Sequence, residues 1–136
     1  MNLSRRQFAG LTLSAAAVSM LGIQPTLAAD STRQGAFTGR SNHITTGAVS
    51  VVKKGDKTVV VLGKDFSFDG APDPKLAFGT NGKYVKGTFI QKNLPKKNWT
   101  GASEHVVPAG IDTSKFDEVY LWCEQFNVPL GVAKIK

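Results

Sequence analysis

The sequence is poor in the residues on which most redox and metal sites depend. It contains one cysteine, Cys123, in 136 residues, and its two methionines, Met1 and Met20, both lie near the N-terminus. A single cysteine excludes an internal disulfide, a Cys-x-x-Cys-His haem attachment site and two-electron dithiol chemistry within the chain. A small domain without a disulfide has to be stabilised by packing alone.

Several other signatures are absent as well. No segment has the length and apolar character of a membrane-spanning helix, which needs about 20 residues. The glycine-rich fingerprints of flavin and nicotinamide binding are missing. The formal charge is +7, but the lysines occur singly or in pairs and form no RNA-binding signature, so nucleic acid is not an expected partner. A basic balance suits an acidic partner or an anionic membrane surface instead.

Residues 1–29 have the three parts of a secretory signal peptide. The chain begins MNLSRRQF, and its Ser-Arg-Arg-x-Phe run resembles the twin-arginine export motif. A mildly apolar stretch follows, and Ala28 and Ala29 precede the polar Asp30. We expect cleavage after Ala28 or Ala29 and a periplasmic or secreted mature protein without a membrane span. A retained N-terminal anchor is the alternative.

The mature part, residues 30–136, is predicted to be one all-β domain. Short segments rich in β-branched and aromatic residues alternate with Gly, Pro and Asp, and none shows sustained helical periodicity. We expect a small antiparallel β-sandwich of about seven or eight strands, similar to the immunoglobulin type. Residues 30–34 are expected to be frayed. The clearest hairpin pairs residues 43–52 with 58–62, and further strands are expected at 75–78, 84–91, 104–108, around Cys123, and at 131–136.

The segment around Cys123 is the densest run of aromatic and β-branched residues after the N-terminal part. In a strand, Cys123 shares one face with Val119 and Leu121, whereas Tyr120 and Trp122 take the opposite face. The thiol is therefore predicted to point into the core. Because apolar burial makes a thiol less reactive, Cys123 is either a redox group or a small hydrophobic packing residue.

The candidate metal or haem ligands of the mature chain are Cys123, His43 and His105. A blue-copper centre uses one Cys, two His and usually an axial Met. The mature chain has no methionine and Cys123 has no histidine directly after it, so copper would need an unusual His-His-Cys centre. Non-covalent haem through either histidine, and no cofactor at all, are the other possibilities.

His105 is also the better candidate for a base beside the Cys123 thiol, provided that the two residues lie on neighbouring strands. The alternative is a strand histidine without contact to the thiol. No complete catalytic constellation accompanies the pair, so the protein is expected to be at most a redox accessory protein and not an enzyme.

Asp65, Asp69 and Asp73 recur at intervals of four residues in a loop rich in Gly and Pro. Three carboxylates of this kind can bind calcium, although the alternate-residue spacing of an EF-hand loop is missing. The favoured interpretation is that they are turn residues whose carboxylates bond local backbone amides. The aromatic residues near this loop, Phe66, Phe68 and Trp99, are expected to belong to the core.

Three stretches resemble the DM13 domain, a small family described as related to electron transfer. They are Gly47 to Val52, Asp65-Phe66 with Gly70-Ala71-Pro72-Asp73, and Pro108 to Val128 around the Trp122-Cys123 pair. The resemblance spans residues 35–135 and implies a β-sandwich related to DOMON domains, with Cys123 at the position of a proposed redox cysteine. The chain departs from the family at His105 and at Pro129-Leu130, where aromatic residues are expected.

Two functions remain in view. The first is an exported redox or electron-transfer-associated module in which Cys123 is the reactive or cofactor-adjacent residue and Trp122 packs beside it. A lone thiol would form a sulfenic acid or a mixed disulfide with a redox protein partner in the periplasm. The second is a non-catalytic binding or scaffold domain in which Cys123 is a packing residue.

Overall fold

The structure, a computed structural model, describes residues 32–136, so the expected signal peptide and its cleavage site lie outside the described residues. The strands in this part are β1 (Thr32–Gly39), β2 (Thr45–Thr46), β3 (Ala48–Lys54), β4 (Lys57–Leu62), β5 (Ser67–Phe68), β6 (Pro74–Thr80), β7 (Lys83–Tyr84), β8 (Ser103–Val106), β9 (Glu118–Cys123) and β10 (Val128–Lys134). Two short 3-10 helices are η2 (Lys96–Asn98) and η3 (Thr113–Lys115). None of the helices between residues 32 and 136 is long and apolar enough to cross a membrane.

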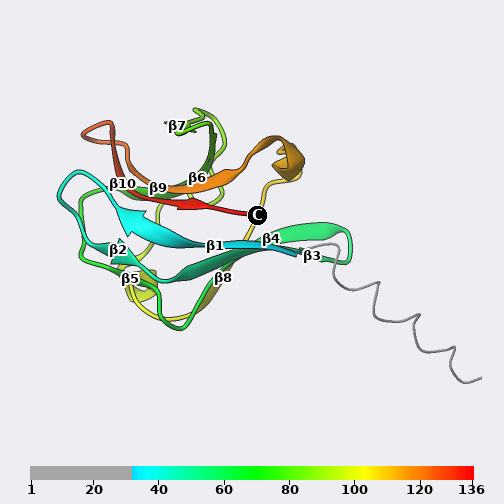
Figure 1. The fold of residues 1–136 in the computed structure, drawn as a ribbon, viewed down its shortest axis with the longest axis horizontal. Helices are drawn as coiled ribbons and strands as arrows, with labels where there is room; N and C mark the ends of the chain where they lie inside the picture. The colour runs from blue at the N-terminus through cyan, green and yellow to red at the C-terminus, as the bar shows by residue number, and fades with distance from the viewer. Residues whose placement is uncertain (1–31) are drawn as a thin grey trace, which may run out of the picture. The chain divides into compact units, whose positions relative to one another are not determined.

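Eight strands form one curled antiparallel sheet in the order β7-β6-β9-β10-β1-β3-β4-β8, and β2 pairs with β5. Strand β1 joins the two halves of this sheet, because residues 32–36 pair with β3 and residues 37–39 pair with β10. The halves face each other as the two layers of a sandwich (Figure 1). The predicted all-β, antiparallel sandwich is therefore confirmed, and its layers are parts of one continuous sheet.

The crossing of β1 between the layers requires a glycine. A Cβ atom added at Gly35 would lie 1.8 Å from the carbonyl oxygen of Lys134, so only hydrogen fits between the two backbones. Just before this point, Gln34 exchanges two backbone hydrogen bonds of 3.1 Å with Lys136 at the C-terminus. Residues 32–34 are thus part of a strand, and the expected frayed start is wrong for them. Pairing on both sides, which local composition does not reveal, orders this polar segment.

The core lies between the two layers. Inward-facing apolar residues alternate with outward-facing ones along the strands, and both layers contribute members with no exposed surface, namely Val49, Val60, Leu62, Leu76, Phe78, Val119 and Leu121. Full burial of such a side chain contributes about 1.5–3 kcal/mol. Phe66 and Phe68 are also buried, and Trp99 packs against this cluster, as predicted.

The predicted hairpin is present as β3 and β4. The two strands are joined by a two-residue turn at Gly55-Asp56, and Lys54 pairs with Lys57 next to it. Gly55 has a φ of 65°, the left-handed conformation that hairpin turns require. The expected segment 43–52 is interrupted at Gly47, because the chain turns there between β2 and β3.

The strand expected over residues 84–91 is wrong, because β7 ends at Tyr84. Gly87 follows with a φ of 88°, and the Thr88 hydroxyl takes part in hydrogen bonds with Phe78 and Val85 backbone groups. Together with backbone hydrogen bonds from Val85 to Phe78 and between residues 90–91 and Leu76, these side-chain bonds hold the segment against β6. The final strand also begins earlier than the expected residue 131, at Val128.

Candidate functional site

Cys123 is the last residue of β9 and is completely buried. It lies opposite Pro74 of β6 and Val128 of β10, and it belongs to the hydrophobic core cluster. Its thiol donates a hydrogen bond to the carbonyl oxygen of Pro72, with an Sγ to O distance of 3.1 Å. The predicted inward orientation is confirmed, and in this conformation the sulfur has no access to solvent.

The Pro72 carbonyl is positioned by a loop with two left-handed residues. Gly70 has a φ of 104° and Asp73 a φ of 55°. Gly70 lies against the ring of Trp99, because an added Cβ would come within 2.8 Å of that ring. Asp73 is held by Lys75 at 3.0 Å. The Gly-Ala-Pro-Asp stretch and the Trp-Cys pair, far apart in the sequence, therefore meet at one thiol.

The early Gly-Ala stretch contacts the same loop. Gly47, with a φ of 107°, lies so close to the loop backbone that an added Cβ would be 2.4 Å from the Cα of Phe66. The amide of Ala48 donates a hydrogen bond of 3.0 Å to the side chain of Asp65. The loop between β4 and β6 thus connects all three stretches that were singled out in the sequence.

The three loop aspartates have separate partners. Asp65 bonds the Ala48 amide, Asp69 accepts from the Ile44 amide at 3.0 Å, and Asp73 pairs with Lys75. Burial raises the pKa of Asp69, but hydrogen bonds from the Ile44 amide and from His43, together with the His43 charge, lower it below its ordinary value. Asp65 and Asp69 do bond backbone amides, but these amides belong to distant segments of the chain, so the predicted local bonds are wrong for both residues.

The structure separates the expected metal ligands. His43 bonds Asp69 at 2.9 Å, whereas His105 lies in β8 at the opposite edge of the sheet from β7. Four strands, β10, β1, β3 and β4, stand between β9 and β8 in the sheet, so the condition for His105 to act as a base, a place on a strand next to Cys123, is not met. Within residues 32–136 no group of three or more His, Cys, Asp or Glu is arranged to hold a metal ion, so the His43, His105 and Cys123 set is not assembled.

His105 is a buried, hydrogen-bonded core residue. Its Nε2 lies 2.9 Å from the Ser103 hydroxyl and its Nδ1 lies 3.1 Å from Oε1 of Gln91. Because an amide oxygen only accepts, Nδ1 carries the proton and Nε2 accepts from Ser103, which describes a neutral imidazole. Burial lowers the pKa of His105 below 6.5. Both nitrogens are therefore engaged away from the Cys123 thiol.

This burial predicts a pH-dependent stability. The unfolded chain takes up a proton at His105 as the pH falls through 6.5, whereas the folded protein does so only at a lower pH. The free energy of unfolding is expected to be highest above pH 6.5 and to decrease as the pH falls from 6.5 toward the lower pKa of the folded protein. Urea unfolding at a series of pH values measures the slope. His105→Gln should reduce it, and an unchanged slope in that variant would contradict the assignment.

An aromatic cluster covers the outer face of β9, on the side opposite Cys123. Trp122 stacks on Tyr84 with a centroid distance of 4.1 Å and an interplanar angle of 17°. Tyr120 contacts both rings edge-on at 6.4 and 6.3 Å, and Phe89 lies 6.2 Å from Tyr84. The alternation of Tyr120 and Trp122 indicates such a pair in the sequence. Tyr84 and Phe89 were missed because the folding back of residues 84–90 is a tertiary feature.

The cluster has room because β6 presents small residues beneath it. Ala77 lies opposite Tyr120, and Gly79 lies opposite Glu118. A Cβ at Gly79 would lie 2.4 Å from the Tyr120 ring, so the missing side chain lets that ring lie flat across the sheet. The aromatic cluster is consequently packed against β6 as part of the folded structure.

Two polar atoms in this cluster have no hydrogen-bond partner within residues 32–136. They are the Tyr84 hydroxyl and Nε1 of Trp122, and both are buried. Burial, followed by the charge of Glu124, raises the pKa of Tyr84. The other tryptophan differs, since Nε1 of Trp99 donates to the Leu94 carbonyl at 3.0 Å. Unpaired buried donors cost about 1–3 kcal/mol each, so their presence calls for an explanation.

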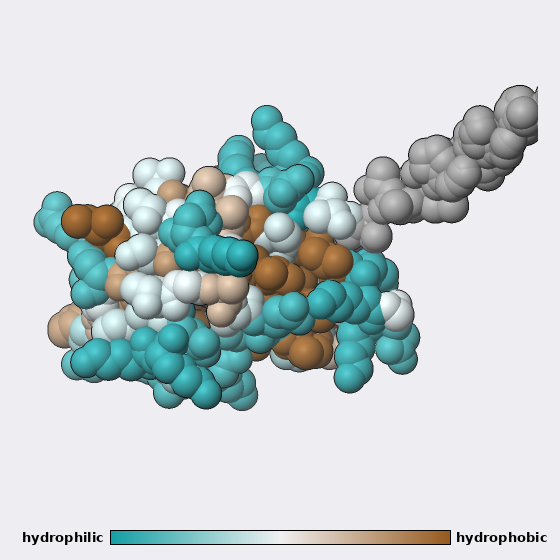
Figure 2. Space-filling model, turned by 90° about the horizontal axis from the view of Figure 1, so that it is seen from below, coloured by the Kyte–Doolittle hydropathy of each residue, from teal (hydrophilic) through white to brown (hydrophobic). Residues whose placement is uncertain are grey.

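Two further surface features lie apart from the thiol. The face seen in Figure 2 carries a hydrophobic area bordered by hydrophilic side chains. Val106, on the edge strand β8, is 54% exposed, and Lys54 reaches across to Glu104 at 3.1 Å. These residues belong to the layer opposite β9 and do not contact Cys123.

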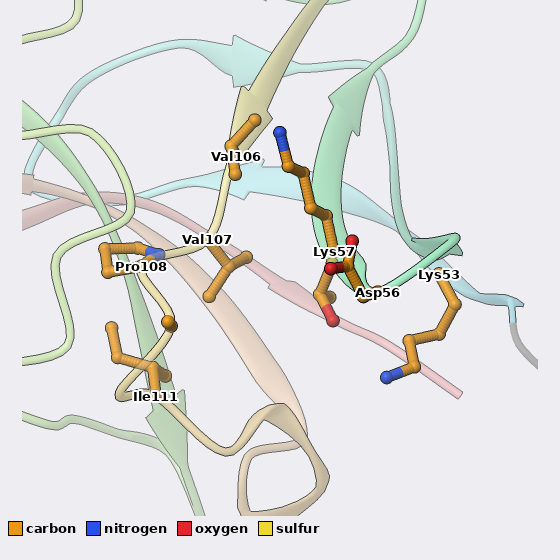
Figure 3. Close-up of a pocket in the computed structure, with 9 residues that line it drawn as sticks. Lys53, Asp56, Lys57, Val106, Val107, Pro108 and Ile111 are labelled. Atoms are coloured by element: carbon orange, nitrogen blue, oxygen red, sulfur yellow. The ribbon is translucent and has the colours of Figure 1, made fainter.

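A cavity of about 410 Å³ lies beside the β3–β4 turn (Figure 3). Its lining residues are Lys53, Asp56, Lys57, Thr58, Val106, Val107, Pro108, Ala109 and Ile111. In Figure 3 the side chains of Lys53 and Lys57 run in different directions, so their ammonium groups do not converge on one point. Pro108, Ala109 and Ile111 belong to the third stretch of the resemblance, but none of the candidate site residues Cys123, Trp122, His43 and His105 lines the cavity.

Comparison with known proteins gave one match. A family model described as Electron transfer DM13 matches residues 36–135, which is nearly all of the part that the structure describes. No curated protein and no solved structure matched the chain. The matched range includes all three stretches around the loop, the thiol and the aromatic cluster.

Proposed function

The chain belongs to the DM13 electron-transfer family, and from this premise we propose that it is an exported redox module centred on the Trp122-Cys123 pair of β9. The contact between the Cys123 thiol and the Pro72 carbonyl carries this proposal, because it joins two of the three stretches of the resemblance at the one thiol of the chain. On the reverse of the same strand, Trp122 lies in the aromatic cluster.

The chemistry open to one thiol is limited. Its sulfur takes one oxygen from a peroxide, which is reduced to water, or it attacks a disulfide of a partner and releases the partner's other thiol. Both reactions require Sγ to leave the Pro72 carbonyl and meet solvent. The loop that carries Pro72 is the natural element to move, because it contains no ladder of strand hydrogen bonds between residues 69 and 73. A periplasmic redox protein is the partner that this chemistry implies.

Thiol labelling under native conditions tests the proposal. Local opening of the Pro72 loop exposes little surface, so the labelling rate of Cys123 is expected to be nearly independent of urea at low concentrations. Labelling through global unfolding would instead rise steeply with urea, following the full m-value. Exposure by global unfolding alone, together with a colourless and metal-free protein after export by its own signal, would contradict the redox role.

The second candidate is a binding or scaffold module in which Cys123 only packs. The complete burial of the residue favours it. In that case Cys123→Ala should lower the free energy of unfolding by about 1 kcal/mol or somewhat more and leave partner binding intact. Cys123→Ser is the matched variant, because it retains a donor for the Pro72 carbonyl while removing the sulfur chemistry.

We also propose that residues 1–29 direct export by the twin-arginine route, on the basis of the Ser-Arg-Arg-x-Phe run. Replacing Arg5 and Arg6 together with lysine is expected to leave the unprocessed precursor inside the cell. Mass spectrometry of the exported wild-type protein should find a chain that starts at Ala29 or Asp30. A mature chain that still carries both arginines would rule the signal peptide out.

A further inference from the structure

We propose that Trp122, stacked on Tyr84, is a one-electron site of this module. It gives one electron to a strong one-electron oxidant, such as a high-valent haem or copper centre of a partner protein, and takes one electron back from a one-electron donor. The proposal rests on the proposed redox function but does not require the thiol. No bond forms or breaks in either step, because the tryptophan alternates between its neutral form and its radical cation.

The stack favours a positive charge on Trp122. The two rings are nearly parallel, with centroids 4.1 Å apart, so the π-face of Tyr84 lies directly against the indole. The negative face of an aromatic ring attracts a cation. The carboxylate of Glu124 adds to this, since its charge already raises the pKa of Tyr84. The ammonium group of Lys75 lies 5.6 Å from the centroid of Phe89 in the same cluster, but it is bound by Asp73 and by the Lys92 carbonyl, which offset its charge.

Trp99, the other tryptophan of the chain, lies in an environment that differs from that of Trp122. Its ring meets Phe68 edge-on, at 5.4 Å and 71°, and no aromatic ring of residues 32–136 stacks parallel to it. The ammonium group of Lys96 lies 5.9 Å from its centroid, and a positive charge there opposes oxidation of the ring. The two tryptophans of the chain therefore differ in the features that decide which of them loses an electron more easily.

The unpaired donors determine what happens to the proton. Nε1 of Trp122 is buried and finds no acceptor within residues 32–136, so an oxidised Trp122 has no group to which it can pass its proton. The Tyr84 hydroxyl likewise has no acceptor within residues 32–136. Oxidation of a tyrosine depends on the loss of its hydroxyl proton. The electron is therefore removed from Trp122 and not from Tyr84, and the oxidised indole stays a cation. The two unpaired donors destabilise the fold, and their role is to keep the oxidised site a cation.

Access to a partner comes from the exposure of the cluster. Trp122, Tyr84 and Phe89 are each partly exposed, whereas Cys123 on the other face of the strand is sealed. A partner at the outer face of β9 can thus approach the indole to within contact distance without any opening of the fold.

Flash photolysis tests the inference with the folded mature protein and photogenerated tris(bipyridine)ruthenium(III) as the oxidant. Wild type is expected to show the transient spectrum of a tryptophan radical cation. Trp122→Phe should lose most of that signal, and the matched Trp99→Phe should keep it. A signal that disappears in Trp99→Phe and persists in Trp122→Phe would overturn the proposal.

Two variants at Tyr84 separate the ring from its hydroxyl. Tyr84→Phe keeps the stack, and the cation signal should be unchanged. Tyr84→Leu removes the stack, and the cation should form in lower yield or decay faster, with circular dichroism used to verify that the variant folds. A neutral, deprotonated tryptophan radical in wild type would contradict the role of the unpaired Nε1.

The Cys123→Ala variant distinguishes a failure of the Trp122 proposal from a failure of the proposed thiol function. The cation signal at Trp122 is expected to persist without the sulfur, and native-state labelling of Cys123 is expected to persist in Trp122→Phe. If wild type shows no radical signal but its thiol is labelled through local opening, the proposal for Trp122 is wrong and the thiol chemistry stands. If the radical signal is seen but the thiol is never exposed by local opening, the thiol chemistry is wrong and the proposal for Trp122 stands.

Discussion

Replacing Gly47 with alanine is expected to lower the free energy of unfolding by about 3 kcal/mol or more. Two costs combine at this position. The φ of 107° lies in a region that side chains rarely adopt, and the new Cβ would lie 2.4 Å from the Cα of Phe66 and 2.6 Å from the carbonyl oxygen of Asp65. Both contacts are with backbone, which cannot rotate out of the way as a side chain can. The loop that carries Pro72 would have to shift.

Gly55→Ala is the matched control for this experiment. Gly55 also has a positive φ, of 65°, but nothing lies within 4 Å of an added Cβ. Its expected cost is therefore only that of the left-handed conformation, about 1–2 kcal/mol. Urea unfolding of both variants measures the difference. Equal losses would show that the close approach between Gly47 and the loop is not what stabilises this region.

The second large effect is expected at Phe78, whose truncation to alanine should cost about 3–5 kcal/mol. Phe78 has no exposed surface and stacks on Phe116 with a centroid distance of 5.4 Å and an angle of 12°. It faces inward from β6, so its removal leaves a cavity between the two layers of the sandwich. A domain of this size is stable by about 5–15 kcal/mol, so the loss is a large fraction of the total.

Phe126→Ala is the comparison, because this phenylalanine is 61% exposed at the turn between β9 and β10. Its truncation should change the free energy of unfolding by no more than about 0.5 kcal/mol. Thermal and urea unfolding report both values. A small effect at Phe78 would mean that the layers can close over the missing ring, contrary to the dense packing that the structure shows.

How far the sequence could predict this protein is clearest at Cys123. Alternation along β9 placed the thiol inward with Val119 and Leu121, and that orientation is confirmed. The β3–β4 hairpin was also predictable, because glycine and charged turn residues separate two β-branched runs. Signals of this kind are local, since they depend on the period of a strand and on the conformations open to glycine.

The failures share a cause. Residues 84–91 have the composition of a strand, yet hydrogen bonds of the Thr88 hydroxyl and the turn at Gly87 fold them over β6. A role for His105 as a base required that it lie on a strand next to Cys123, but β8 pairs with β4 at the far edge of the sheet. Sheet order depends on which strands meet in three dimensions, and composition carries little information about it.

The sequence by itself determined the composition of the candidate site, the all-β class, the inward thiol and the membership of the DM13 family, because each follows from residue types at short spacings. The tertiary structure alone decided that Pro72 closes over the sulfur, that the two histidines lie elsewhere, and that Tyr84 stacks on Trp122. These are contacts between segments far apart in the chain, and they exist only because β1 crosses between the two layers and closes the sandwich around one core.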